Sequence, residues 1–137
     1  MAAANPEITY EFLPAKPTGP ASPAVVYLAS LGSNSSRQTQ RQRLDKIASL
    51  LTSGLDDCFS FQWESVCYEV AQAVRTMLCE EISPKTGEQL SLSYVNAHLA
   101  ALRSVLKESW RLGLMSEEQR ARACDPEVMR VNPDSWH

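Results

Sequence analysis

The chain has 137 residues, of which 44% are hydrophobic, and a formal net charge of -3 at pH 7. This length and hydrophobic content fit one domain with a core of its own and exclude a chain that is disordered throughout. No segment approaches the roughly 18 consecutive apolar residues of a membrane helix. Residues 1–10 have neither the basic nor the apolar region of a secretory signal, so we expect a cytoplasmic protein without a membrane span.

Residues 1–22 are interpreted as a proline-rich, flexible leader. Five prolines lie between positions 6 and 23, and proline at this spacing interrupts helices and favours extended chain. Docking of the leader onto the rest of the molecule stays open as an alternative. The residues that could dock are Ile8, Tyr10, Phe12 and Leu13.

Two helices are predicted in the first half of the chain. The first covers residues 24–31: Ser22 is the expected cap, Pro23 fits the first turn, and Gly32 ends the helix. The second covers residues 37–52, after a run of residues that favour helix starts. Its apolar positions are spaced as one buried helix face and comprise Leu44, Ile47, Ala48 and Leu51.

A third helix is predicted from residue 61 to about 79, and a fourth and longest helix from about 91 to 112. Both show apolar residues at alternating intervals of three and four, which is the period of a helix. Ser91 or Ser93 offers a cap for the longest helix, and Gly113 is the expected left-handed residue after its end.

A fifth, short helix is predicted to begin at Ser116, where Ser-Glu-Glu-Gln matches a capping box, and to run to about residue 123. No segment shows the alternation of a strand, so we expect an all-α fold of four to five short helices in an antiparallel, SAM-like bundle. The helical domain is placed at 23–124. The remainder, 125–137, has no apolar periodicity and is interpreted as a linker or tail.

The sequence gives no reason to expect a cofactor, a metal or catalysis. The four cysteines have no close pair, so we interpret them as reduced residues that fill space. The motifs of nucleotide-binding loops, serine hydrolases and zinc proteases are absent. His98 lies beside apolar residues in the longest helix, where a boundary position is more common than a catalytic base.

The stretch 91–115 resembles the last long helix of the core-binding domain of tyrosine recombinases, the phage-integrase family. The family pattern is a capping Ser or Thr, an Asn, Leu-x-x-Leu-Arg, and Trp or Ala before Arg-x-Gly-Leu. Here it corresponds to Ser91 or Ser93, Asn96, residues 99–103 and residues 110–114. Three further segments look like other elements of that domain, in the family's order, namely 24–31, 35–48 and 61–66. Residues 85–92 look like an insertion relative to the family.

The resemblance covers about residues 23–124 and implies a helical DNA-binding domain of a site-specific recombinase, which grips one face of a recombination half-site during DNA integration or recombination. The implied partners are double-stranded DNA and other recombinase protomers in a synaptic complex, with no small-molecule substrate. In the family a second domain supplies the catalytic residues. Because residues 125–137 have no room for it, we expect no catalysis by this chain alone, and nucleoid association when DNA is bound.

Two basic segments lie within the acidic chain: residues 33–52 carry +3 and residues 91–112 carry +2. In the second, about 100° per residue places Asn96, Arg103 and Lys107 along one flank of the helix, suited to phosphates and base edges. The start of the first offers backbone N–H groups to a phosphate. The predicted DNA-binding residues are Ser35, Ser36, Arg37, Thr39, Arg41, Ser93, Tyr94, Asn96, Arg103, Lys107 and Arg111.

Two alternatives stay open. These basic faces could be solvated surfaces whose cations pair with Asp and Glu side chains. The chain could also be a helical protein-interaction module that recruits or regulates a partner, through apolar edges instead of phosphate contacts.

Overall fold

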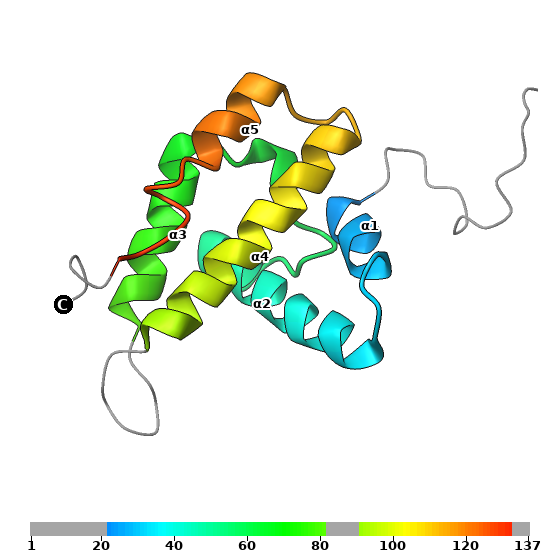
Figure 1. Cartoon of the computed structure of the whole chain (residues 1–137), viewed down its shortest axis with the longest axis horizontal. Helices are drawn as coiled ribbons and strands as arrows, with labels where there is room; N and C mark the ends of the chain where they lie inside the picture. Colours follow the sequence, from blue (N-terminus) through cyan, green and yellow to red (C-terminus); the bar gives the residue numbers. More distant parts are fainter. Residues whose placement is uncertain (1–21, 82–90, 133–137) are drawn as a thin grey trace, which may run out of the picture.

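The computed structural model describes residues 22–81 and 91–132, and within these ranges the chain is helical without a strand (Figure 1). The prediction of an all-α fold is therefore confirmed. The elements in chain order are α1 (Pro23–Ala29), α2 (Asn34–Thr52), the 3-10 helix η1 (Trp63–Ser65), α3 (Tyr68–Glu80), α4 (Leu92–Arg111) and α5 (Glu117–Ala123). The predicted leader up to residue 21, most of the proposed insertion and residues 133–137 lie outside the described residues.

Helix α4 is the centre of the fold, because α1, α2, η1, α3 and α5 all pack against it. In Figure 1 it runs diagonally across the molecule, between α3 on one side and α1 and α2 on the other. The apolar stripe predicted for this helix is buried, and the buried face is wider than expected. Its buried residues are Val95, His98, Leu99, Ala101, Leu102, Val105, Leu106 and Ser109.

Serine caps begin three of the helices. The Ser33, Ser91 and Ser116 hydroxyls each accept the backbone N–H three residues further on, at 3.0, 3.1 and 3.1 Å. This satisfies one of the N–H groups that the first helical turn leaves unpaired. Ser22 is the N-cap residue of α1 and Pro23 lies in the first turn, as predicted, but the Ser22 side chain makes no capping hydrogen bond, and its Oγ atom is buried without a partner among the described residues.

The region predicted as one helix over 61–79 is two elements. Trp63–Ser65 forms η1, Val66 has extended backbone, and α3 begins only at Tyr68. The indole of Trp63 is completely buried, and its Nε1 atom donates a hydrogen bond to the Cys58 carbonyl at 2.9 Å. The apolar spacing correctly predicted that Trp63, Val66 and Val74 are buried, but Val70 and Met77 at the same spacing are only partly buried. Burial at that spacing does not require a continuous helix.

The prediction of a linker or tail from residue 125 onward is wrong for 125–132. Val128, Met129 and Val131 are buried. The Asn96 amide of α4 bonds to both backbone groups of Val131: its Nδ2 donates to the carbonyl at 3.1 Å, and its Oδ1 accepts the N–H at 2.7 Å. The described part of this segment is therefore packed against α4 and belongs to the same core.

Candidate nucleic-acid interface

An open groove of about 580 Å³ lies between α2 and the N-terminal half of α4. It brings the predicted residue Thr39 of α2 together with the predicted residues Ser93 and Tyr94 of α4. The residues that line it are Thr39, Gln42, Arg43, Lys46, Ser91, Ser93, Tyr94, Ala97 and His98. Hydroxyl, amide and cationic side chains from two separate helices thus meet on one surface, which we call the α2–α4 groove.

The charge of the α2–α4 groove comes from Arg43 and Lys46. The Lys46 Nζ atom pairs with the Glu81 carboxylate at 2.8 Å, which compensates that cation. Arg43 makes no ion pair with any residue that the structure describes, although it is close enough to His98 to influence its ionisation. Among the described residues, the groove therefore has one positive charge without a carboxylate partner, beside a set of neutral donors and acceptors.

His98 forms part of the groove wall and is only 5% exposed. Its Nδ1 atom lies 2.9 Å from the Tyr94 carbonyl oxygen, and since a carbonyl only accepts, Nδ1 carries the proton. Burial is the main cause that lowers the pKa of His98 below 6.5; Arg43 and Lys46 act in the same direction, against the Tyr94 hydrogen bond and Glu81. The imidazole is therefore neutral at pH 7.

The start of α4 adds backbone donors to the groove. Ser91 accepts the N–H of Tyr94 through its hydroxyl and that of Val95 through its carbonyl. The N–H groups of Leu92 and Ser93 come before the first intrahelical hydrogen bond and have no acceptor within the helix. Together with the positive end of the helix dipole, they make this edge suitable for an anionic group such as a phosphate.

Four other predicted residues lie at the start of α2 but outside the α2–α4 groove. Ser35 and Ser36 are exposed, and the Ser36 N–H is already bonded to the Ser33 cap. The Arg37 guanidinium donates to the Leu31 carbonyl at 2.7 Å and to Asn34 Oδ1 at 2.5 Å. Its hydrogen bonds hold the turn between α1 and α2, so Arg37 has a structural task that the sequence did not predict.

Arg41, the last of these residues, faces a different surface. It lies 3.6 Å from the Asp45 carboxylate, and its guanidinium carbon is 5.0 Å from the centre of the Phe59 ring. At about 100° per residue, Arg41 is turned roughly 200° from Thr39 on α2. The residues predicted on α2 therefore do not form one binding face.

The flank of α4 forms a third location. The Asn96 amide is engaged with Val131, and Arg111 pairs with Glu108 at 2.9 Å. Arg103 and Lys107 are exposed and make no ion pair within residues 22–81 and 91–132. The predicted basic stripe is thus reduced to these two cations.

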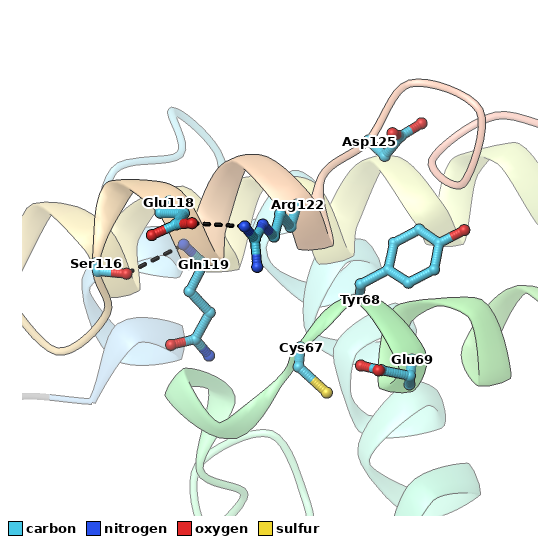
Figure 2. A pocket seen from close by; sticks show the side chains of 8 residues that line it. All are labelled: Cys67, Tyr68, Glu69, Ser116, Glu118, Gln119, Arg122 and Asp125. Carbon is cyan, nitrogen blue, oxygen red and sulfur yellow. Dashed lines mark hydrogen bonds and ion pairs between the residues drawn. The ribbon is translucent and has the colours of Figure 1, made fainter.

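A cleft of about 610 Å³ between the start of α3 and α5 contains none of the predicted residues (Figure 2). Its charged groups are the ion pair of Arg122 with Glu118, at 2.6 Å, and the carboxylates of Glu69 and Asp125. The excess of negative charge makes this cleft unsuited to a phosphate.

Comparisons of the chain with protein-family models, with curated proteins and with solved structures found no match. Within the described ranges, no group of three or more His, Cys, Asp or Glu side chains is placed to hold a metal ion. No helix in the same ranges has the length and apolar character needed to cross a membrane.

The sequence interpretation missed Arg43, Lys46 and His98 as groove residues. A signal for the first two was present, because Thr39, Arg43 and Lys46 recur at intervals of four and three along α2, beside its apolar face. A helix places such residues within about 60° of one another. No comparable signal marked His98, whose position depends on how α2 packs against α4.

Proposed function

We propose that this helical bundle is a DNA-binding module and that the α2–α4 groove contacts the backbone of duplex DNA. The observation that supports it best is the meeting of Arg43 and Thr39 with Ser93 and the start of α4. A guanidinium without an ion pair among the described residues, two hydroxyls and N–H groups without an acceptor in their own helix are the donors that proteins use for phosphate oxygens. Tyr94, with its ring packed on His98 at a centroid distance of 4.2 Å, supplies a rigid wall.

Arg103 and Lys107 extend the proposed interface along α4. Both cations are exposed and lack carboxylate partners among the described residues, so pairing with a phosphate would break no ion pair. Arg103 is also able to contact a guanine edge, whereas Lys107 fits a phosphate as a point charge. Arg37, Arg41, Asn96 and Arg111 are less suitable, since each already has an intramolecular partner.

The resemblance to the core-binding domain of tyrosine recombinases supports a more specific proposal. According to this proposal, the module grips a recombination half-site for DNA integration or recombination, together with other recombinase protomers. The chain itself performs no strand cleavage. Cytoplasmic location with nucleoid association belongs to the same proposal. The SAM-like arrangement of the helices is also part of it.

Titration of a fluorescently labelled duplex, followed by anisotropy at several salt concentrations, tests this function. Contact with phosphates predicts that the logarithm of the association constant falls linearly with the logarithm of salt concentration. Arg43→Gln should weaken binding on all duplexes alike and reduce the slope by about one ion. Arg122→Gln is the matched control, because it removes the same charge from the cleft between α3 and α5.

Two results would contradict the proposal. One is the absence of duplex binding at low salt by a folded chain. The other is an equal effect of Arg43→Gln and Arg122→Gln, which would indicate attraction by overall charge instead of contact in the groove.

A protein-interaction role is the second candidate, and one observation favours it. Val25 and Phe59 are 43% and 39% exposed and line the same groove on the other side of α2. Exposed apolar side chains that share one hollow are typical of surfaces that another polypeptide covers. This role predicts salt-insensitive association with a protein and no duplex binding.

A further inference from the structure

The second groove, which we call the α1–α2 groove, has an apolar floor and a basic edge. It encloses about 560 Å³ between α1, α2 and the loop that carries Phe59. Its lining residues are Val25, Leu28, Arg37, Gln38, Arg41 and Phe59. A groove with this mixture is suited to a short segment that combines apolar side chains with carboxylates.

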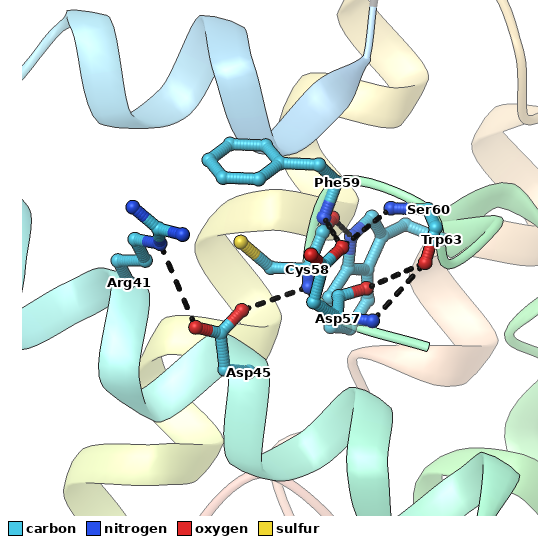
Figure 3. Close-up of polar contacts among 7 residues, drawn as sticks. All are labelled: Arg41, Asp45, Asp57, Cys58, Phe59, Ser60 and Trp63. Atoms are coloured by element: carbon cyan, nitrogen blue, oxygen red, sulfur yellow. Dashed lines mark hydrogen bonds and ion pairs between the residues drawn. The ribbon is translucent and has the colours of Figure 1, made fainter. Parts of the chain in front are cut away.

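The loop holds Phe59 outward through several hydrogen bonds (Figure 3). Asp57 Oδ1 accepts the N–H groups of Phe59 and Ser60, each at 2.9 Å, and Asp45 Oδ1 accepts the Cys58 N–H at 2.8 Å. The two hydrogen bonds that Asp57 accepts lower the pKa of its carboxyl group, chiefly the one from the Ser60 N–H. Since the neighbouring Cys58 and Trp63 are completely buried, the exposed ring of Phe59 is a fixed feature of this surface.

We propose that residues 7–13 of the same chain occupy the α1–α2 groove, an interaction that goes beyond the proposed DNA binding. In this segment Ile8, Tyr10 and Phe12 alternate with Glu7, Thr9 and Glu11. In an extended chain, such alternation directs the apolar side chains to one side and the polar side chains to the other. The apolar side matches Val25, Leu28 and Phe59.

Charge complementarity supports this occupant. Residues 7–13 carry a net charge of -2, and the groove edge carries the guanidinium groups of Arg37 and Arg41. Each guanidinium has only one or two of its donors engaged inside the molecule, which leaves others for Glu7 and Glu11.

The length of the connection also supports it. The segment joins α1 through residues 14–22, and the groove residues Val25 and Leu28 lie in the first two turns of that helix. Residues 14–21 can span at most about 28 Å, whereas α1 is about 10 Å long. The segment can therefore reach the groove of its own chain, and the connection raises its local concentration there.

Photocrosslinking of the full chain tests the proposal without DNA. Tyr10 is replaced by p-benzoylphenylalanine, the monomeric protein is irradiated, and crosslinked peptides are identified by mass spectrometry. We expect crosslinks within one chain to peptides that contain Val25, Leu28 or Phe59. The same photoreactive residue at Thr9, on the polar side of the segment, should give about fivefold less of this product.

Crosslinks to a second copy, crosslinks to other surfaces, or no crosslinks would each overturn the proposal.

The charge contribution is tested with Arg41→Glu, which should lower the yield about fivefold, and with Glu11→Lys in the same chain, which should restore it. Lys107→Glu is the matched control on α4 and should leave the yield unchanged. Circular dichroism of each variant confirms that it is folded, so that a low yield reflects the contact.

Discussion

Asn96 and Val131 are joined by two hydrogen bonds that use both ends of the Asn96 amide and both backbone groups of Val131. Asn96→Ala would leave the buried backbone of Val131 without these partners and should lower the free energy of unfolding by about 1–3 kcal/mol. Thermal denaturation followed by circular dichroism measures this loss. Ser93→Ala, an exposed position on the same helix, should change the melting temperature little, and equal effects of the two variants would contradict the structural role of Asn96.

His98 makes the stability of the fold dependent on pH. Its pKa is lowered in the folded chain, so below about pH 6.5 the unfolded chain binds a proton that the folded chain does not. The contribution of neutral His98 to the free energy of unfolding is therefore complete above about pH 6.5. It is lost as the pH falls toward the lower pKa that His98 has in the folded chain. Denaturant titrations between about pH 7 and 5 should show this decline in the wild type and a flatter profile in His98→Gln.

Hydrogen bonds to the carboxylates lower the pKa of Asp57, Glu69 and Glu117 below ordinary values of 3.8 to 4.5, so their contributions to stability are lost at lower pH than that of His98. They do not interfere with the interval in which His98 titrates. A profile of His98→Gln that declines as steeply as the wild type between pH 7 and 5 would assign the effect to another group.

Arg103→Ala tests the extension of the interface along α4. Because Arg103 is exposed and has no ion pair among the described residues, the variant should keep its melting temperature. Its free energy of unfolding should change by less than about 0.5 kcal/mol. If Arg103 contacts a phosphate, the salt slope of DNA binding falls by about one; if it reads a guanine, about 1–3 kcal/mol is lost on the cognate site alone. Unchanged DNA affinity with a lowered melting temperature would show that Arg103 is structural.

This chain alone should neither cleave nor rejoin DNA. The Tyr94 ring packs against His98, a neutral ring that is itself bonded to the Tyr94 carbonyl, and of the two cations that line the same groove, Lys46 is already paired with Glu81. Incubation with a nicked suicide duplex followed by denaturing electrophoresis should show no covalent adduct. An adduct that Tyr94→Phe abolishes would contradict this expectation.

The helices, most of their ends and most of the core were predictable from the sequence, because these depend on local chemistry. Leu44, Leu99 and Leu102 are buried as their spacing predicts, and Gly113 has the expected positive φ of 78°. The break before α3 was not predictable in this way. It depends on the buried hydrogen bond from Trp63 to Cys58, two residues whose mutual position is set by the packed core.

The candidate site was predictable only in part, because it depends on which helices become neighbours. Thr39, Ser93 and Tyr94 were predicted and share the α2–α4 groove, whereas Arg41 lies on the opposite side of α2. Asn96 shows the limit most clearly. Its position on the polar flank of α4 suggested a DNA contact, but the segment after α5 folds back onto it, and residues 125–132 have no periodicity that predicts such packing.

The central position of α4 has a consequence for the order in which the chain can become structured. Every other helix packs against α4, yet α4 follows α1, α2 and α3 in the sequence. During synthesis from the N-terminus, the apolar faces of α1 and α2 therefore remain without their main partner, and that of α3 without one of its partners, until residue 111 has emerged. Until then these apolar faces are open to chaperones and to other chains, and we expect stable structure to form only when α4 arrives.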